Sequence, residues 1–233
     1  MEMQVPNHLA VVLDGNRRWA RAHDMQPWMG HKYGAEKVDK LFDWCLQLNI
    51  PQLSIWVGST ENLTNRSRKE VKELLKVYYD YCKIWENKQP LLDKYEVRVR
   101  FIGDLNRLPK KLLRIMGKLM QRTANHQKKI LNVMINYGGK LELLDIMKKI
   151  AAKAIKVGRV QITERDIEGN LWLQSPVDLI VRTGGHSRLS NFCLWQAAYA
   201  EIYVTDTLWP DFTKRELVKA IKWYNQTQRN FGR

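Results

Sequence analysis

Short apolar runs alternate along this chain with longer stretches of helical spacing, and this alternation limits what the chain can fold into. The runs with the length and composition of buried strands are 8–13, 53–57, 95–102, 130–137 and 177–182. The stretches in which apolar residues recur at helical spacing are 35–48, 67–90, 109–124, 141–155, 162–173 and 213–231. Strands that alternate with helices form a mainly parallel sheet covered on both faces. We therefore predict an α/β protein.

The first apolar run stops abruptly at Asp14-Gly15-Asn16 and continues into a pair of arginines, Arg17 and Arg18. This order predicts a strand, a tight turn and a helix, and the first N–H groups of such a helix favour an anion. The two guanidinium groups and the one carboxylate suit a diphosphate with a bridging divalent cation. An ordinary turn with surface arginines is the alternative interpretation.

Polar clusters follow several of the predicted strands at the point where each strand ends. They are Asp14 to Asn16, Ser59 to Asn62, Asn136 to Gly139 and Arg182 to Gly185. Ligands of parallel sheets bind beyond the carboxyl ends of the strands, so we expect these clusters to converge. Arginine presents a planar fork of donors, and several arginines together can hold two diphosphate groups. The residues of this predicted anion site are Arg17, Arg18, Arg182 and Arg188, with Asn16 and Ser190.

Several common catalytic signatures are missing from the chain. No GxGxxG follows the first strand, and GxxxxGK[ST], GxSxG and HExxH do not occur. The sequence therefore argues against a dinucleotide oxidoreductase, a P-loop NTPase, an α/β-hydrolase and a zincin. Paired aspartates of the DDxxD type are also missing.

The chain carries a net charge of +15, and no acidic residue lies between Asp104 and Glu142. Such a basic field attracts nucleic acid, anionic lipid or a diphosphate substrate, and charge alone does not choose among them. A solvated helix face is another interpretation, because an apolar stripe lies opposite these lysines. Since no nucleic-acid-binding motif is recognised, we expect no nucleic-acid partner and hypothesise peripheral contact of 110–129 with an anionic membrane.

Length and cysteine content bound the domain organisation and the compartment. With 233 residues the chain fits one large α/β domain with a substantial core. It shows neither a signal peptide nor a spanning apolar run, so we expect a cytoplasmic location. Cys45, Cys82 and Cys193 are odd in number and lack metal-site spacing, so we expect core thiols rather than disulfides or a zinc site.

Five motifs, in register from about His8 to Phe231, resemble those of one enzyme family. They are HLAVVLDGNRRWA, GHKYGAEKV, STENLTNR, INYGG and VDLIVRTGGHSRLSNFCLWQAAYAEIYVTDTLWPDF. On these motifs the chain is identified as a member of the cis-prenyltransferases, the undecaprenyl diphosphate synthase family. The resemblance implies a single catalytic domain over 1–233, with a central, mainly parallel sheet surrounded by helices and an apolar tunnel beside the sheet.

The resemblance also implies an activity. The family condenses isopentenyl diphosphate with an allylic diphosphate, makes a new cis double bond and releases diphosphate with Mg²⁺. We accordingly expect allylic substrates of the farnesyl or geranyl type, a cis-polyprenyl diphosphate product, Mg²⁺ as cofactor and a homodimeric assembly. Candidate walls of the tunnel are Trp56, Met134 and the apolar side of 71–85.

Roles of single residues are carried over by motif from the family. Asp14 would engage the metal and the allylic diphosphate, and Glu201 matches a second metal-binding carboxylate, supplied within the chain or across the dimer. Asn16, Ser59 or a diphosphate oxygen would accept the proton that leaves C2 of the isopentenyl group, and the sequence leaves this choice open. The other residues expected around the allylic diphosphate are Gly15, Arg17, Arg18, His31, Glu61, Asn62 and Arg66. Those expected to hold the isopentenyl diphosphate are Arg182, Arg188 and Ser190.

Some positions depart from the family pattern. Pro27 stands where an arginine is usual, Leu63 where an aromatic is usual, and His186-Ser187 where a turn usually begins with an acidic residue; Asn230 also differs. The departures at Pro27, Leu63 and His186-Ser187 support an alternative activity, either lavandulyl-type coupling of two allylic diphosphates or prenylation of another acceptor. A non-catalytic partner subunit is less favoured, because the expected site residues are present.

Overall fold

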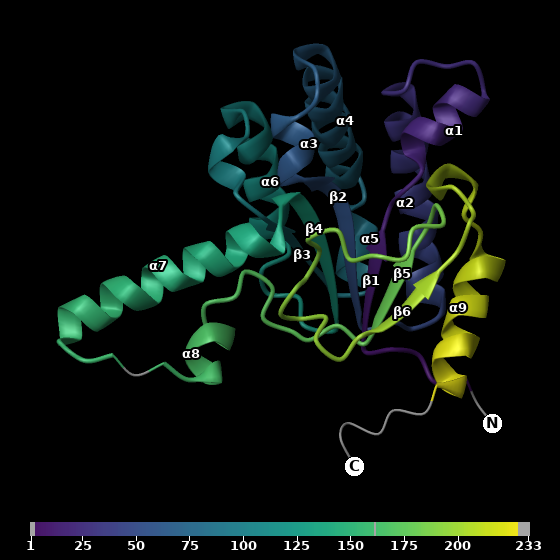
Figure 1. Ribbon diagram of the computed structural model, residues 1–233. Helices are drawn as coiled ribbons and strands as arrows, with labels where there is room; N and C mark the ends of the chain where they lie inside the picture. Colours follow the sequence, from purple (N-terminus) through teal and green to yellow (C-terminus); the bar gives the residue numbers. More distant parts are fainter. Residues whose placement is uncertain (1–2, 161, 228–233) are drawn as a thin grey trace.

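A sheet of six parallel strands forms the centre of the computed structural model, which describes residues 3–160 and 162–227 (Figure 1). The strands lie in the order β3-β4-β2-β1-β5-β6, and every adjacent pair is parallel. They are β1 (His8–Val12), β2 (Gln52–Ser59), β3 (Val97–Ile102), β4 (Lys129–Tyr137), β5 (Leu179–Arg182) and β6 (Glu201–Val204). The predicted α/β fold with a parallel sheet is confirmed. The short edge strand β6 is not among the predicted strands.

Helices connect these strands, and side-chain caps fix where some of them begin. The Ser67 hydroxyl accepts the N–H of Glu70 at 3.3 Å at the start of α4, and Thr213 and Glu216 form a capping box before α9. The helices are α1 (Asn16–Ala22), α2 (Met29–Gln47), α3 (Thr60–Thr64), α4 (Arg68–Glu86), α5 (Gln89–Lys94), η1 (Leu105–Arg107), α6 (Lys110–Arg122), α7 (Gly139–Val157), α8 (Glu164–Glu168), η2 (Trp209–Asp211) and α9 (Lys214–Gln226).

Several of the predicted helices have different ends in the structure, and the one predicted over 35–48 begins earlier, at Met29. The stretch 67–90 forms two helices, because α4 ends at Glu86 and Pro90 lies in the first turn of α5. Proline is tolerated there, since the first N–H groups of a helix have no partner within it. The predicted helix over 213–231 forms as α9, and its last positions, 228–231, lie outside the described residues.

The helix predicted over 162–173 is shorter in the structure, where it is α8. A side chain distant in the sequence accepts hydrogen bonds from the main chain at the end of the predicted helix. The main-chain N–H groups of Trp172 and Leu173 donate to the buried Glu142 carboxylate, at 2.7 and 3.1 Å. Glu142 also accepts the hydroxyl of Tyr137 at 2.6 Å. A buried carboxylate needs such donors, so the segment after α8 is irregular rather than helical where it covers Glu142.

The two faces of the sheet have different covers. A large apolar core lies between one face and helices α2, α4, α6 and α9. A smaller core on the other face includes Leu173, Val177 and Phe192 from the irregular segment 171–200. The prediction of a sheet covered on both faces is confirmed, and an irregular segment supplies much of the second cover. The start of α7 is buried against Tyr137 and Trp172, and the rest of this helix projects from the body as an arm (Figure 1).

Two expectations from composition can be compared with the structure. Cys45, Cys82 and Cys193 are buried and free, which confirms the prediction of core thiols. Among the helices of 3–160 and 162–227, none combines the length and the apolar character that crossing a membrane requires.

A buried polar group links three strands on the second face. His8 Nε2 lies 2.7 Å from the Ser54 hydroxyl, and Asn132 Nδ2 donates to the same hydroxyl at 2.9 Å. His8 Nδ1 lies 2.7 Å from the main-chain oxygen of Pro176. Burial lowers the pKa of His8 to about 4, so the imidazole is neutral at pH 7.

Acidification should destabilise the protein through His8. Its pKa is about 4 in the folded chain and 6.5 in its ordinary state, so the unfolded chain binds more protons between these values. The contribution to stability is complete above the ordinary pKa and is lost as the pH falls toward the folded value. From pH 7 to pH 5 we expect His8 by itself to lower the free energy of unfolding by about 2 kcal/mol.

Urea unfolding at both pH values checks this expectation. His8→Gln should lose about 2 kcal/mol less than the wild type on acidification. Identical pH dependence in His8→Gln and the wild type would contradict the assignment.

Candidate active site

The polar clusters that follow β1, β2 and β5 line one pocket at the carboxyl edge of the sheet, with a volume of about 520 Å³. Parallel strands end at the same edge, which is why clusters far apart in the sequence meet there. The cluster after β4 lies outside this pocket, and its Asn136 is buried and donates to the main-chain oxygen of Asp104 at 2.7 Å. The predicted site residues that line the pocket are Asp14, Gly15, Asn16, Arg17, Arg18, His31, Ser59, Glu61, Asn62, Arg66, Arg182 and Ser190.

An ion pair between Asp14 and Arg182 lies at the centre of this pocket. Arg182 ends β5 with only 5% of its side chain exposed, and its Nη2 lies 2.9 Å from Asp14 Oδ2. Its Nη1 donates to the Ser190 hydroxyl at 2.9 Å and to the main-chain oxygen of Arg188. A buried guanidinium group requires such acceptors, so Arg182 fixes both the end of β1 and the loop after β5.

A second arginine approaches Asp14 from the start of α1. Arg18 Nη2 lies 3.3 Å from Asp14 Oδ1 and donates to the main-chain oxygen of Gly184 at 2.7 Å. A Cβ at Gly184 would lie 2.3 Å from this Nη2, and its φ of 81° also favours glycine. Both carboxylate oxygens of Asp14 are therefore paired with guanidinium groups.

Asn16 is the first residue of α1, and its side chain lies against α2. Its Nδ2 donates to the main-chain oxygen of Leu13 at 3.1 Å, and its Oδ1 is buried without a hydrogen-bond partner in the described chain. A Cβ at Gly34 would lie 2.1 Å from this Oδ1. Glycine at this position of α2 is therefore what lets the Asn16 amide fit there.

A cationic group, Arg66, and a neutral group, His31, are in contact in the wall of the pocket. Arg66 Nη1 lies 2.9 Å from Nε2 of His31. Burial, together with the positive charges of Arg66 and Arg17, lowers the pKa of His31 to about 3. His31 is therefore neutral at pH 7 and can accept a hydrogen bond from Arg66.

The segment after β2 adds a carboxylate to the pocket. Ser59 caps α3 by accepting the N–H of Asn62 at 3.2 Å. Glu61 accepts Nδ2 of Asn191 at 3.1 Å. Desolvation opposes ionisation of Glu61, but hydrogen bonds from its own main chain and from neighbouring side chains outweigh it and lower the pKa of this carboxyl. Asn191 also lines the pocket and is not among the predicted residues, although it follows Ser190 directly.

Two predicted site residues do not line the pocket. Arg188 is exposed on the loop after β5, and only its main-chain oxygen contacts Arg182. Glu201 opens β6 opposite Leu179, and its N–H donates to the main-chain oxygen of Asp178. It therefore lies at the amino edge of the sheet, whereas Asp14 follows the carboxyl end of β1.

The pocket suits a cation that arrives with phosphate groups. Within 3–160 and 162–227, no group of three or more histidines, cysteines and carboxylates could hold a metal ion by itself. Mg²⁺ in phosphate-binding sites is usually held by one or two carboxylates together with substrate phosphates and water. Asp14 supplies one such carboxylate among arginines, and the residues present fit Mg²⁺ in this manner.

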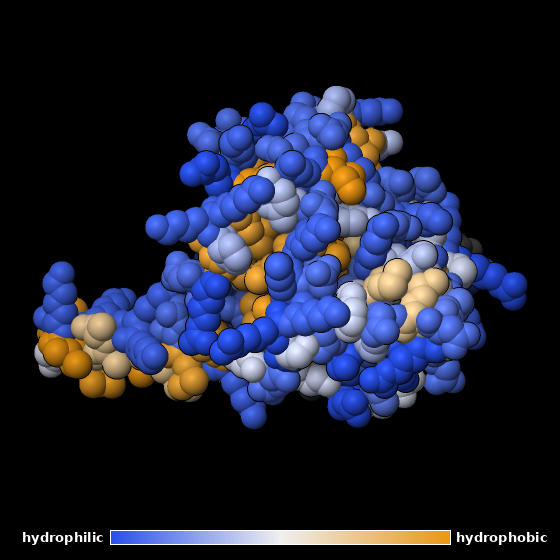
Figure 2. Space-filling view, turned by 90° about the horizontal axis from the view of Figure 1, so that it is seen from above, coloured by the Kyte–Doolittle hydropathy of each residue, from blue (hydrophilic) through white to orange (hydrophobic). Residues whose placement is uncertain are grey.

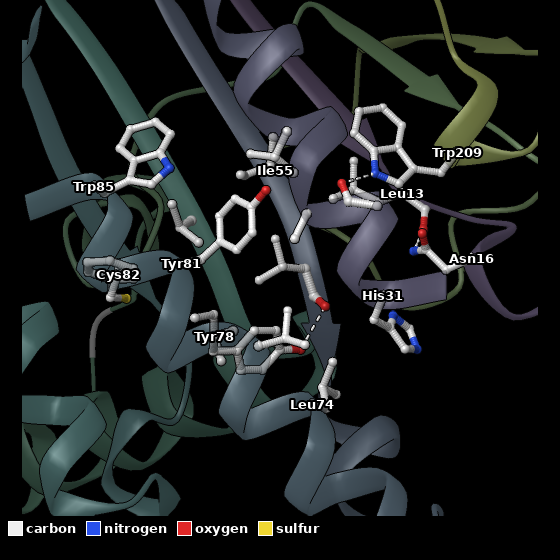
Figure 3. Close-up of a pocket in the computed structure, with 18 of the residues that line it drawn as sticks. Leu13, Asn16, His31, Ile55, Leu74, Tyr78, Tyr81, Cys82, Trp85 and Trp209 are labelled. Carbon is white, nitrogen blue, oxygen red and sulfur yellow. Dashed lines mark hydrogen bonds between the residues drawn. The ribbon is translucent and has the colours of Figure 1, made fainter. Parts of the chain in front are cut away.

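An apolar cavity of about 90 Å³ adjoins the polar pocket (Figure 3). Asn16 and His31 lie at one end of it, Trp85 and Cys82 lie at the other, and the ring of Tyr81 lies between. The residues that line both spaces are Leu13, Asn16, His31 and Val57. The predicted apolar space beside the sheet is thereby confirmed.

The walls of this cavity follow the alternation of the strands. Ile55 and Val57 of β2 point into it, and α4 supplies another wall, as predicted for 71–85. Trp56 and Met134 were expected as walls, and the structure contradicts both expectations. They belong to the core on the other face, because neighbouring residues of a strand point to opposite faces.

Comparison with known proteins identifies the family. A family model described as putative undecaprenyl diphosphate synthase matches residues 12–232. The chain belongs to this cis-prenyltransferase family. An isoprenyl transferase of Fusobacterium nucleatum is 40% identical over 233 residues, which cover 100% of this cis-prenyltransferase and 98% of the relative. The predicted family and the prediction of an enzyme are confirmed.

Two solved structures resemble this cis-prenyltransferase over almost their whole length. Lavandulyl diphosphate synthase from Lavandula x intermedia, in complex with dimethylallyl diphosphate, has a TM-score of 0.91 and 32% identity and covers 98% of this chain and 99% of that chain. A probable undecaprenyl diphosphate synthase from Campylobacter jejuni has a TM-score of 0.80 and 33% identity and covers 99% of this chain and 100% of that chain. Both support the fold of this cis-prenyltransferase.

A side chain at Gly34 should destabilise this cis-prenyltransferase. A Cβ there would lie 2.1 Å from Asn16 Oδ1 and 2.9 Å from Cδ1 of Trp209. We expect Gly34→Ala to lower the free energy of unfolding by about 1–3 kcal/mol, measured by chemical denaturation. Gly117→Ala is the matched control, because a Cβ at this position of α6 meets nothing within 4 Å. It should raise stability by about 0.5–1 kcal/mol. Equal changes in both variants would contradict the close approach.

Proposed function

We propose that this cis-prenyltransferase condenses isopentenyl diphosphate with an allylic diphosphate of the farnesyl or geranyl type, with Mg²⁺, to give a cis-polyprenyl diphosphate. The observation that supports this most is the junction of two unlike spaces. An arginine-rich pocket adjoins an apolar cavity, and the two share Asn16 and His31. A molecule with a diphosphate head and a hydrocarbon tail has the same division of polarity.

The apolar cavity would favour the allylic tail by removing it from water. Each buried CH₂ group contributes about 0.8 kcal/mol to binding. The head would lie among the arginines that surround Asp14, near the start of α1, whose N–H groups favour an anion. A substrate in this orientation has its reacting carbon where the pocket and the cavity meet.

The chemistry needs stabilisation of a departing diphosphate. The allylic C–O bond breaks, the double bond of isopentenyl diphosphate forms the new C–C bond, and a proton leaves C2 of the same molecule. Negative charge develops on the departing diphosphate, and Arg17, Arg18 and Arg182 would stabilise it there. Asn16, Ser59 and a diphosphate oxygen remain the candidates for accepting the proton.

Asp14 would hold Mg²⁺ together with the diphosphate oxygens of the substrate. When bound, the ion would neutralise charge on the leaving diphosphate. Glu201 lies at the other edge of the sheet in the same chain, so a metal role for it would require a second copy. Arg188 and Ser190 would hold the isopentenyl diphosphate with Arg182.

A homodimer is part of this proposal. The arm formed by α7 carries large exposed apolar side chains and projects from the body (Figure 2). Exposed apolar side chains in such number favour a protein partner, and we propose a second copy of this chain. A monomer in sedimentation equilibrium at micromolar concentration would contradict it. The residues concerned are Leu144, Met147, Ile155 and Val157.

Peripheral binding to an anionic membrane is a further part of the proposal. On α6 the exposed side chains are basic, apart from one glutamine, and the opposite side of the helix packs into the core. A cationic helix face favours anionic lipid headgroups. Flotation with neutral and anionic vesicles tests this, and equal binding to both would contradict it. The cytoplasmic location stays a prediction. The exposed basic residues are Lys110, Lys111, Arg114, Lys118 and Arg122.

Coupling of two allylic diphosphates is the second candidate function. The similarity to the lavandulyl diphosphate synthase structure favours it, as do the departures at Pro27, Leu63 and His186-Ser187. Prenylation of a different acceptor belongs to the same candidate. A non-catalytic partner subunit has less support, because the arginines and Asp14 are assembled in one pocket.

Product analysis distinguishes these functions. We expect purified protein with Mg²⁺ and farnesyl, geranyl or dimethylallyl diphosphate to form Z-configured products only when isopentenyl diphosphate is added. Mass spectrometry and NMR identify the products. A branched product from allylic substrate alone would support the second candidate and contradict the first.

Replacing the carboxylate of Asp14 should remove most of this activity. Asp14→Asn keeps the shape of the side chain but removes the charge that would face Mg²⁺, and we expect kcat to fall by about 100-fold or more. Asp104→Asn is the matched control, because that carboxylate lies outside the pocket and pairs with Arg107 at 2.9 Å. Steady-state kinetics across a Mg²⁺ titration measure the effect. Unchanged turnover in Asp14→Asn would refute its role.

A further inference from the structure

Asn191 lies on the wall of the active-site pocket in a backbone conformation that few residues adopt. Its φ is 71°, and that of the preceding Ser190 is 52°. The left-handed region is costly for most side chains but is tolerated by asparagine, aspartate and glycine. Two successive residues in this region turn the loop after β5 back over the pocket, where Asn191 contacts two other segments.

The oxygen atoms of Asn191 bind the start of α7. Its main-chain oxygen accepts the N–H of Gly139 at 2.8 Å, and its Oδ1 accepts the N–H of Lys140 at 2.8 Å. These N–H groups belong to the first turn of a helix and have no partner within it. The main-chain oxygen and the side-chain oxygen of Asn191 therefore cap α7.

The side-chain NH₂ group of Asn191 binds Glu61. Its Nδ2 donates to Oε1 of Glu61 at 3.1 Å. A Cβ at Gly138 would lie 2.7 Å from this Nδ2, so glycine there leaves room for the amide. Because Oδ1 is engaged by α7, the amide can present only its NH₂ group to Glu61.

The two halves of the pocket are joined through this residue. Glu61 follows β2, whereas Arg182 ends β5, and β1 lies between these strands. Ser190, the neighbour of Asn191, accepts Nη1 of Arg182, and Arg182 pairs with Asp14. A continuous series of contacts thus runs from Glu61 through the loop to Asp14.

We propose that Asn191 is a positioning residue that fixes the Glu61 half of the pocket relative to the Arg182 half. It thereby sets the separation at which two diphosphate groups bind. This inference rests on the proposed function, in which each half holds one diphosphate. Asn191 acts through Glu61 and Ser190 rather than on the reacting atoms, and displacement of the two substrates from each other would slow their reaction.

Asn191→Asp separates this role from the capping of α7. Aspartate tolerates the same backbone conformation and keeps an oxygen for the N–H of Lys140, but it faces Glu61 with a second carboxylate. We expect a thermal midpoint close to that of the wild type, with kcat/KM and the affinity for inorganic diphosphate each lower by roughly tenfold. Asn191→Gly keeps only the backbone conformation and should lose both contacts of the side chain.

Reversal of the hydrogen bond supplies a rescue. In the double variant Glu61→Gln with Asn191→Asp, the new amide can donate to the new carboxylate. We expect this variant to have a higher diphosphate affinity than the product of the two single effects predicts. A residue that serves only the fold would give no such recovery.

The pH profile gives an independent readout. Hydrogen bonds that include the one from Asn191 keep the pKa of Glu61 below its ordinary value. Removal of this donor in Asn191→Gly should raise that pKa, because the donor stabilises the ionised carboxylate. The acidic limb of kcat/KM should therefore move to higher pH.

The outcomes separate this inference from the proposed function. If the wild type turns over no prenyl diphosphate, the proposed function fails. Calorimetric titration with inorganic diphosphate then tests the positioning role of Asn191 by itself. Equal diphosphate affinity in the wild type and Asn191→Asp overturns the positioning role. So does a loss of affinity that follows a loss of stability and is not recovered in the double variant.

Discussion

The buried guanidinium group of Arg182 is the constraint on which the active site depends. It is placed by β5, a strand whose residues are all buried, and it needs acceptors because water does not reach it. Asp14, Ser190 and the main chain of Arg188 supply them. These partners come from the end of β1 and from the loop after β5. One charge therefore brings the parts of the pocket together and leaves a carboxylate held among arginines.

The boundary between the polar pocket and the apolar cavity has its own electrostatics. Guanidinium groups surround the pocket, but the residues shared by both spaces carry no charge. Asn16 has a neutral amide, and His31 is neutral because burial and two nearby arginines lower its pKa. A charged group at this junction would have to be desolvated beside hydrocarbon. Near this junction, the guanidinium groups thus lie on the side where phosphate groups would bind.

The sequence predicted those parts of the fold that depend on local patterns. Strands buried on both faces read as apolar runs, and capping residues such as Ser67 and Thr213 marked helix starts. β6 was not predicted from the sequence, because its four residues are half exposed and lie at the edge of the sheet. The helix expected over 162–173 was too long because Glu142, distant in sequence, captures the N–H groups of Trp172 and Leu173. No local pattern records such a contact.

The site was predictable to a similar degree and for similar reasons. Polar clusters at strand ends converge because the sheet is parallel, so most of the pocket followed from topology. The assignment of Trp56 and Met134 to the tunnel ignored strand alternation, which the sequence does contain. Asn191 could not be singled out, since its importance lies in a left-handed backbone and in contacts to α7 and Glu61.

The apolar cavity has one stiff wall and one compliant wall. β2, β3 and β4 form the first, and hydrogen bonds between their main chains hold them at fixed spacing. α2, α4 and α6 form the second, and side-chain packing holds them against the sheet, with single hydrogen bonds such as that from the Tyr78 hydroxyl to the main-chain oxygen of Val57. A hydrocarbon chain that outgrows the space would displace helices more readily than strands, because few hydrogen bonds hold the helices to the sheet. The elasticity of helix packing, and not the geometry of the sheet, therefore sets the capacity of this cavity.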